Sequence, residues 1–313
     1  MPHTDESFAA MLLTLPLSPE GEEAVKPLNG RELGNLCGKL SLSGAPLSSL
    51  RGRDVSYLMS SLGLGEDEAY RLCILLSRDM LVFKLLEDCL DRNVSILTPF
   101  DNEYPASVRG HMGGIQAPPM FVKGNPKLFD VNYVGILGIE GVKTPESVLA
   151  GVRDLVEQAA DCGLGIATED SLGACRAARM AAMDKDGALL ARMICAVDGN
   201  LFGAMEKYER YTDNGTALVV SLAHPEAPAS TRNVEKLLCA LSCAAFIATT
   251  DGKQDEAEIV RHALCDYLYV FDAPELPGNA YAAAKGFEKI TRADVSGNFD
   301  KWTGKRGEQL SFL

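Results

Sequence analysis

The sequence predicts an α/β protein with a Rossmann-like parallel sheet, helices on both faces of that sheet, and a small all-helical domain before it. Two observations support this. Between residues 30 and 93, apolar residues recur at three-to-four spacing in short segments, which is typical of amphipathic helices. From residue 131 onward, near-continuous apolar runs alternate with helical patterns, as in parallel sheets built from βα units.

This pattern divides the chain into four expected regions. The prolines and acidic residues of 1–29 predict an irregular N-terminal arm. Residues 30–93 are expected to form the helical domain, and residues 94–293 the Rossmann-like domain. Residues 294–313 remain as a C-terminal tail.

The elements of the Rossmann-like region follow in order. Short strands are expected at 94–97 and 120–122, on either side of a segment rich in proline and glycine. The later strands are expected at 131–141, 164–168, 191–198, 216–223, 243–249 and, as the last, 268–274. Helices are expected between them at 144–163, 173–187, 201–215, 230–242 and 255–267. In the first of these helices, Thr144 is the expected N-cap and Gly163 the stop.

Composition narrows the class of function. The net charge of −13 argues against a surface coated with basic residues for nucleic acid, although a local basic patch remains compatible with it. Nine cysteines without a C-x-x-C pair, and four histidines without metal-ligand spacing, predict reduced thiols and no metal site. The N-terminus lacks a basic signal-peptide region, and the longest apolar stretch, 237–248, is too short to span a bilayer. We therefore expect a cytoplasmic protein without a membrane partner.

One segment carries a family resemblance. The run "ILTPFDNEYPASV" is followed by "APPMFVKGN". This order resembles the DNA-processing DprA/Smf family, in which an acidic residue and Tyr-Pro precede Pro-Pro, an apolar strand and Lys/Arg-Gly-Asn. The residues that match are Asp101, Tyr104, Pro105, Pro118, Pro119, Lys123, Gly124 and Asn125. The resemblance extends over about residues 30–290.

The resemblance implies a Rossmann-like sheet, binding of single-stranded DNA, loading of RecA and a homodimer. It implies no catalytic residue and no cofactor. A non-catalytic role in DNA uptake and recombination is therefore the first hypothesis. Whether the protein is an enzyme stays open, and the resemblance favours a protein without catalytic activity.

The family's ligand loops are altered in this sequence. After the first sheet strand the family has Gly-Ser/Thr-Arg, where this chain has Gly138, Ile139 and Glu140. In the next loop, "TEDSLGACRAAR", the family's Ser, Gly, Arg, Asp and His are replaced in turn by Thr168, Glu169, Leu172, Cys175 and Arg179. Carboxylates would repel a phosphate where backbone amides could otherwise hold it.

The candidate positions fall into two groups. The DNA- or anion-binding candidates are Gly138, Thr168, Gly173, Arg176, Arg179, Arg232, Asn233, Lys236 and Lys253. The altered loop positions are Glu140, Glu169, Asp170, Cys175, Asp255 and Glu256.

Two alternatives remain open. The acidic positions are expected at the carboxyl ends of parallel strands, where α/β sheets hold ligands, so they could serve a nucleotide-type small-molecule sensor or processing enzyme. The third hypothesis is an interaction scaffold that keeps only the fold.

Overall fold

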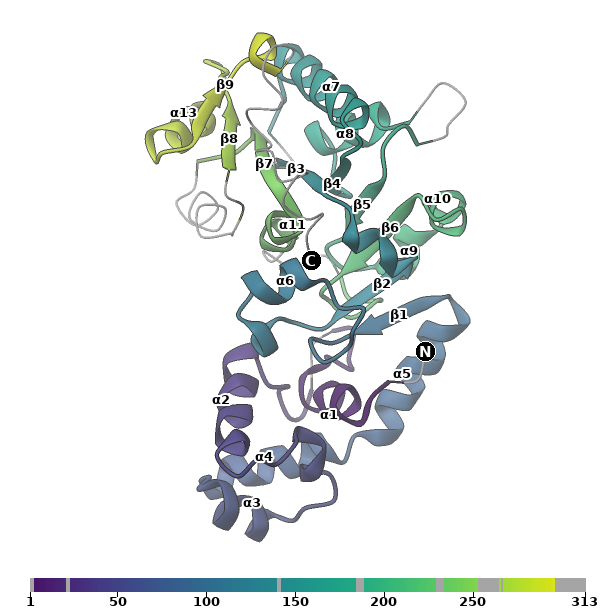
Figure 1. The fold of residues 1–313 in the computed structure, drawn as a ribbon, viewed down its shortest axis with the longest axis vertical. Helices are drawn as coiled ribbons and strands as arrows, with labels where there is room; N and C mark the ends of the chain where they lie inside the picture. Colours follow the sequence, from purple (N-terminus) through teal and green to yellow (C-terminus); the bar gives the residue numbers. More distant parts are fainter. Residues whose placement is uncertain are drawn as a thin grey trace, which may run out of the picture. The chain divides into compact units, whose positions relative to one another are not determined.

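The computed structural model describes residues 3–20, 23–139, 142–183, 189–228, 234–252, 265 and 267–295 (Figure 1). It divides into two compact units. The first comprises Met1–Lys123, Gly199–Gly203 and Ser221–Ser230. The second comprises Gly124–Asp198, Ala204–Val220 and Thr231–Leu313.

The first unit begins with helices around a leucine-rich core. The helices are α1 (Asp5–Thr14), α2 (Gly30–Ser41), η1 (Leu47–Leu50), α3 (Val55–Leu62), α4 (Glu66–Leu76) and α5 (Asp79–Asp91). Asn29 and Glu32 form a capping box that starts α2, because each side chain bonds the other residue's backbone N–H. Leu33, Leu50 and Leu75 are among the core residues that these helices bury.

The prediction of an irregular arm over residues 1–29 is wrong for its first half, because Asp5–Thr14 is a helix. Thr4 caps this helix by accepting a hydrogen bond from the Ser7 amide at 3.1 Å. Every residue from Ser7 to Leu13 is buried, so the sequence offers no polar face from which a helical period could be recognised. The buried Arg78 guanidinium donates to the carbonyls of Leu12 and Leu15 just where the helix ends.

A two-stranded antiparallel pair follows the helices. Strand β1 (Val94–Leu97) pairs with β2 (Met120–Gly124), with Val94 opposite Lys123. Between them lie the short helices α6 (Ala106–His111) and η2 (Gly114–Gln116). Both strands occupy the positions that their apolar patterns predict.

The second unit is built on a parallel sheet. Its described strands are β3 (Tyr133–Gly138), β4 (Gly165–Glu169), β5 (Met193–Ala196), β6 (Ala217–Ser221), β7 (Ser242–Thr249), β8 (Tyr267–Phe271) and β9 (Glu288–Ile290). They lie side by side in the order β6-β5-β4-β3-β7-β8-β9, and each neighbouring pair is parallel. The prediction that 268–274 is the last strand is wrong, since the three-residue edge strand β9 follows it.

Helices cover this sheet on both faces, which confirms the predicted α/β class (Figure 1). Helices α7 (Glu146–Asp161) and α8 (Ala174–Ala181) bury Val152, Leu155 and Ala178 in one core with β3, β4 and β7. Helix α11 (Val234–Leu241) packs on β3, β4 and β7 outside that core cluster. The remaining elements are η3 (Pro126–Asp130), α9 (Leu201–Met205), α10 (Glu209–Asp213) and α13 (Pro277–Ala284).

The predicted helix 201–215 is two short helices, α9 and α10, because the chain leaves helical geometry between Met205 and Glu209. The predicted helix 255–267 lies outside the described residues except for Cys265 and Tyr267. Among the described helices, none is long and apolar enough to cross a membrane.

Candidate nucleic-acid interface

The strand order reverses between β3 and β7, because β3 pairs with β4 on one side and β7 on the other. In open α/β sheets, ligands bind outside the carboxyl ends of the strands at such a switch point. The segments that begin there are the residues after Gly138, the β4–α8 loop from Glu169 to Gly173, and the residues after Thr249. This edge of the sheet is therefore the candidate site.

Gly138 lies at this edge of the sheet, where β3, β7 and α8 pack closely together. A Cβ atom at this position would lie 3.1 Å from Thr249 Oγ1 and 3.2 Å from the Ala174 Cβ. The next amide, of Ile139, donates to both the carbonyl and the hydroxyl of Thr249 at 3.2 Å. The glycine is needed because α8 and β7 approach the strand closely, which is a packing role.

The side chain of Arg179, a cation from α8, binds the carbonyl oxygens of the β4–α8 loop. The Arg179 side chain, 8% exposed, donates to the carbonyl oxygens of Glu169 and, at 2.8 Å, Ser171. Its guanidinium also lies 3.3 Å from the Asp170 carboxylate. Because planar guanidinium groups bind fixed sets of oxygen atoms, this arrangement holds the loop carbonyls toward the protein interior.

Asp170 is fully engaged by neighbouring side chains. Its Oδ1 accepts a hydrogen bond from the Tyr208 hydroxyl at 2.7 Å, and its Oδ2 accepts one from Lys207 Nζ at 3.0 Å. With Arg179 this makes two cations and a phenol around one carboxylate. The negative charge of Asp170 is thus neutralised within the protein.

The thiols near this loop are held in their neutral form. Burial raises the pKa of the Cys175 thiol, and burial also raises that of Cys195, to about 12. Burial, together with neighbouring Cys195 and Asp170, raises the pKa of the Tyr208 hydroxyl. Since the thiolate is the reactive form of cysteine, neither thiol is suited to act as a nucleophile.

The predicted binding residues separate into buried and accessible ones. The Thr168 hydroxyl is buried in β4 and donates to the Ile136 carbonyl at 3.0 Å. Arg176, one turn before Arg179 in the same helix, is exposed, and Lys236 in α11 is half-buried. Gly173 starts α8 with φ +64° and ψ −128°, and no side chain caps it.

Six of the predicted positions lie outside the described residues. They are Glu140, Arg232, Asn233, Lys253, Asp255 and Glu256.

A groove next to the loop was not foreseen from the sequence. It has a volume of ≈ 760 Å³ and lies between α7, α8 and the segment after β3. Lys143, Arg153 and Arg176 are its basic lining residues. Lys143 and Arg153 are lining cations that were not among the sequence candidates. For Lys143, its position in the loop after the first parallel strand was the available signal.

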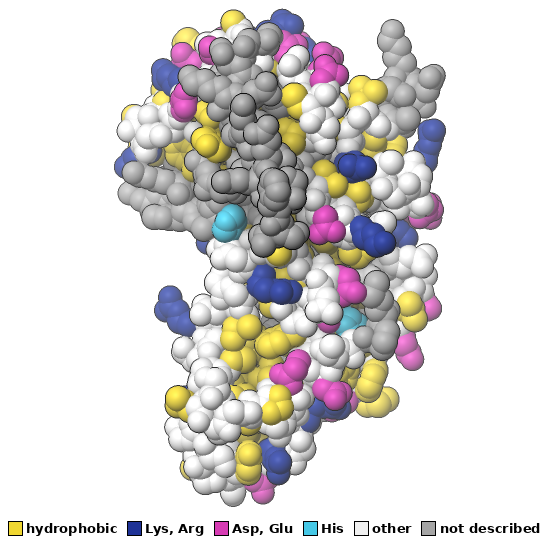
Figure 2. Space-filling model, in the orientation of Figure 1, with side chains coloured by type: hydrophobic (Ala, Val, Ile, Leu, Met, Phe, Trp, Pro, Cys, Tyr) yellow, Lys and Arg dark blue, Asp and Glu magenta, His cyan; other side chains and the backbone are white. Residues whose placement is uncertain are grey.

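Basic side chains do not form a continuous stripe on the visible part of this unit. Figure 2 shows Lys and Arg lying singly among acidic, apolar and other side chains. Among the described residues, no group of three or more His, Cys, Asp or Glu side chains could hold a metal ion.

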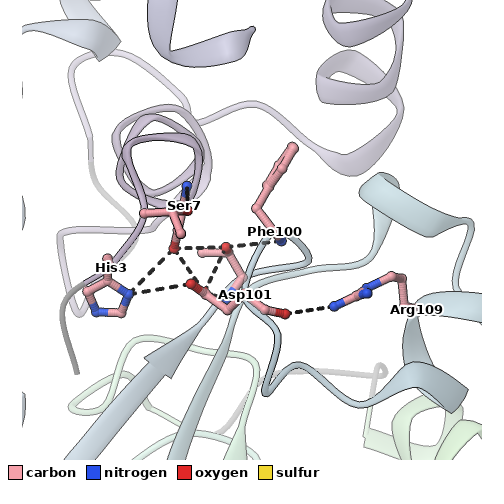
Figure 3. A network of polar contacts seen from close by, with 7 residues as sticks. His3, Ser7, Phe100, Asp101 and Arg109 are labelled. Atoms are coloured by element: carbon pink, nitrogen blue, oxygen red, sulfur yellow. Dashed lines mark hydrogen bonds and ion pairs between the residues drawn. The ribbon is translucent and has the colours of Figure 1, made fainter.

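The motif around Asp101 has a structural explanation in the first unit (Figure 3). The Asp101 carboxylate accepts hydrogen bonds from the Thr98 amide at 2.7 Å, the Thr98 hydroxyl at 2.9 Å and the Ser7 hydroxyl at 2.8 Å. His3 Nδ1 lies 3.7 Å from the same carboxylate. The network therefore ties α1 to the turn after β1.

The other motif residues extend this packing. Arg109 donates to the Asp101 carbonyl at 2.7 Å, and the buried Tyr104 donates its hydroxyl proton to the Pro118 carbonyl at 2.8 Å. Lys123 is buried and its Nζ donates to the Arg92 carbonyl at 3.1 Å. These residues hold the β1–β2 connection and face other parts of the same unit.

A helical segment followed by a parallel sheet with a switch point defines a Rossmann-type α/β protein. More particularly, the fold is DprA-like. It is similar to DNA processing protein A (DprA) from Streptococcus pneumoniae, with a TM-score of 0.63 and 14% identity over 95% of this chain and 99% of that chain. It is also similar to DNA processing protein A from Helicobacter pylori, with a TM-score of 0.50 and 18% identity over 67% of this chain and 97% of that chain.

The H. pylori structure is described as one that gives insight into a single-stranded DNA binding mode. No protein-family model and no curated protein matches this sequence. At these identities the likeness concerns the fold, which agrees with the resemblance recognised in the Asp101 motif.

Proposed function

We propose that this protein is a non-catalytic DNA-processing protein that binds single-stranded DNA during DNA uptake and recombination. The observation that carries the proposal is the DprA-like fold, which extends over nearly the whole of both chains in the S. pneumoniae comparison. The single-stranded DNA binding described for the H. pylori protein supports the choice of ligand.

Within this proposal, the accessible cations make the DNA contacts. Arg176 and Lys236 are the described candidates that reach solvent, and Arg232, Asn233 and Lys253 complete the candidate surface on sequence grounds. Gly138, Thr168 and Arg179 instead support the loop, because their atoms are buried against β3, β7 and the loop carbonyls. The surface therefore differs from a phosphate loop that uses its own backbone amides.

The proposal includes RecA as a partner, a homodimer and a cytoplasmic location. Light scattering during gel filtration measures the dimer, and pull-down with purified RecA measures the partner. A monomer, or no RecA retention, would remove that part of the proposal without affecting DNA binding.

The acidic-rim alternative finds no support at Asp170. Both carboxylate oxygens of this residue already accept hydrogen bonds from Tyr208 and Lys207. A ligand or cation at this position would have to displace those partners.

Fluorescence anisotropy of a labelled single-stranded oligonucleotide tests the function. Binding that is tight at low salt and weakens steeply toward physiological salt is expected, since neutralised phosphates release counterions. A full-length protein that does not bind the oligonucleotide at low salt would contradict the proposal and favour a scaffold with the same fold.

A further inference from the structure

The groove between α7 and α8 has the size and lining of a small-ligand site. Its volume of ≈ 760 Å³ lies within the range of about 300–1,000 Å³ typical of such sites. It opens at the carboxyl edge of β3 and β4, where α/β sheets bind ligands. The groove is independent of the Asp170 network, because none of its lining residues belongs to that network.

The groove carries positive charge. Lys143 and Arg176 are exposed lining residues for which the described part of the chain provides no ion-pair partner. The third cation, Arg153, is paired with Glu146. Among the described lining residues there is no carboxylate. The charge therefore favours an anionic ligand group between Lys143 and Arg176.

Polar groups converge at the same end of the groove. Thr144 Oγ1 is a buried atom without a hydrogen-bond partner among the described residues. It lies 3.2 Å from the position that a Cβ atom on Gly173 would take. Gly173 begins α8, whose first turn has no side-chain cap and whose dipole adds to the field of the two cations. Buried polar atoms normally find a partner, so an oxygen-rich anion fits this end.

The remaining wall is aliphatic. Leu149, Leu172 and Met180 line it, and Leu172 and Met180 are 54% and 58% exposed. Large apolar side chains that are exposed side by side mark binding surfaces. The described lining residues include no aromatic ring, so the groove lacks the stacking platform that single-stranded nucleic acids use. An aliphatic chain matches this wall better than a base does.

We propose that the groove between α7 and α8 binds a small anion with an aliphatic chain: a carboxylate or phosphate monoester whose head group lies between Lys143 and Arg176 and whose chain lies on Leu149, Leu172 and Met180. This site goes beyond the proposed DNA-binding function and does not depend on it.

Isothermal titration calorimetry of the full-length protein with octyl phosphate tests the site, with inorganic phosphate and 1-octanol as partial probes. Octyl phosphate is expected to bind more than about tenfold tighter than either, because it combines the charge with methylene burial. Equal binding of octyl phosphate and 1-octanol would overturn the anionic head group, and no octyl phosphate binding would overturn the site.

Variants locate the binding. Lys143→Gln and Arg176→Gln are each expected to weaken octyl phosphate binding by about tenfold, the size of one charge-assisted contact. Ala177→Phe is expected to abolish it by filling the groove. Arg210→Gln removes an exposed cation from α10 and is expected to leave binding unchanged. Circular dichroism checks that each variant is folded; an equal effect of Arg210→Gln would contradict the proposed location.

Two further experiments distinguish a soluble ligand from a membrane lipid, and this site from the proposed DNA-binding function. Vesicles containing phosphatidic acid are expected not to bind, because a soluble amphiphile is proposed; vesicle binding without octyl phosphate binding would overturn the proposal. Octyl phosphate is titrated in the absence of DNA. Octyl phosphate binding without oligonucleotide binding would therefore remove the DNA function and leave this site in place. Oligonucleotide binding without octyl phosphate binding would remove this site and leave the DNA function in place.

Discussion

Two aspartates, each in a turn after a strand, organise the two units in different ways. Asp101 accepts hydrogen bonds from the neutral groups of Thr98 and Ser7, with His3 nearby. Asp170 is surrounded by Arg179, Lys207 and the Tyr208 hydroxyl. The first network belongs to the motif that matches the DprA/Smf pattern. The second belongs to the loop that departs from it.

The two networks explain the matching motif and the departing loop in different ways. The matching motif is explained by folding, because its side chains hold α1 and the β1–β2 connection together. The departing loop is explained by self-closure, because Arg179 and Lys207 neutralise the Asp170 carboxylate within the protein. A motif that resembles a family signature can therefore be explained by folding, while a loop that departs from the pattern closes on itself.

The largest expected effect comes from Arg179→Met. It leaves Asp170 partly buried with fewer partners and frees the carbonyls of Glu169 and Ser171. We expect a loss of about 3–5 kcal/mol in the free energy of unfolding, as for other broken buried pairs. Urea denaturation followed by circular dichroism measures it. A loss as small as that of a surface variant would mean that Arg179 does not close the loop.

The next effect is expected from Asp101→Asn. The residue is 7% exposed, and an uncharged amide oxygen accepts the three hydrogen bonds from Thr98 and Ser7 more weakly than the carboxylate Oδ2 does. A loss of about 2 kcal/mol is expected at neutral pH. Ser7→Ala is the matched variant, because it removes one donor and keeps the carboxylate.

The same variant has a defined pH dependence. Burial opposes the charged form of Asp101, but hydrogen bonds from His3, Thr98 and Ser7 outweigh it and lower the pKa. A lowered pKa gives stability that is present above the unfolded value and lost as the pH falls, here below about pH 4. The difference between wild type and Asp101→Asn should therefore shrink in urea titrations at pH 3; a constant difference would contradict the charge argument.

A smaller effect is expected from Gly173→Ala. Its φ of +64° lies where side chains are strained, and a Cβ would lie 3.2 Å from Thr144 Oγ1. A loss of about 1–2 kcal/mol is expected. Gly163→Ala is a useful comparison, because it also has positive φ but would meet nothing within 4 Å. In thermal unfolding, the midpoint temperature of Gly173→Ala should be lower than that of Gly163→Ala. The opposite order would show that the Thr144 contact does not destabilise the protein.

The smallest effect is expected from Lys207→Gln. Its side chain is 64% exposed, and exposed ion pairs contribute about 0–1 kcal/mol. The unfolding midpoint should change little and the change should disappear in high salt. A loss comparable to that of Arg179→Met would mean that both cations are equally important to the loop.

Sequence reasoning predicted the parallel sheet well because period and spacing are local properties. Strands β4 and β7 lie within one residue of the positions that their apolar runs predict. Helix α1 was not predicted, because its consecutive buried residues show no hydrophobic periodicity. Thr144 was expected to cap α7, but Pro145 occupies that position and the Thr144 hydroxyl has no described partner.

The inward direction of Arg179 could not be predicted either. Arg176 and Arg179 are three residues apart in α8, and the sequence alone gives both as candidate DNA contacts. Only the folded loop shows that one points to carbonyl oxygens and the other to solvent. Such distinctions depend on tertiary contacts and not on residue type.

Arg176 and Arg179 together allow a direct test of the closed loop. Oligonucleotide anisotropy is measured across salt for wild type, Arg176→Gln and Arg179→Lys, with affinities referred to the folded fraction. We predict salt-dependent binding by wild type, a severalfold weaker affinity and a salt slope smaller by about one for Arg176→Gln, and an unchanged affinity for Arg179→Lys. Loss of affinity in Arg179→Lys with none in Arg176→Gln would contradict the closed loop.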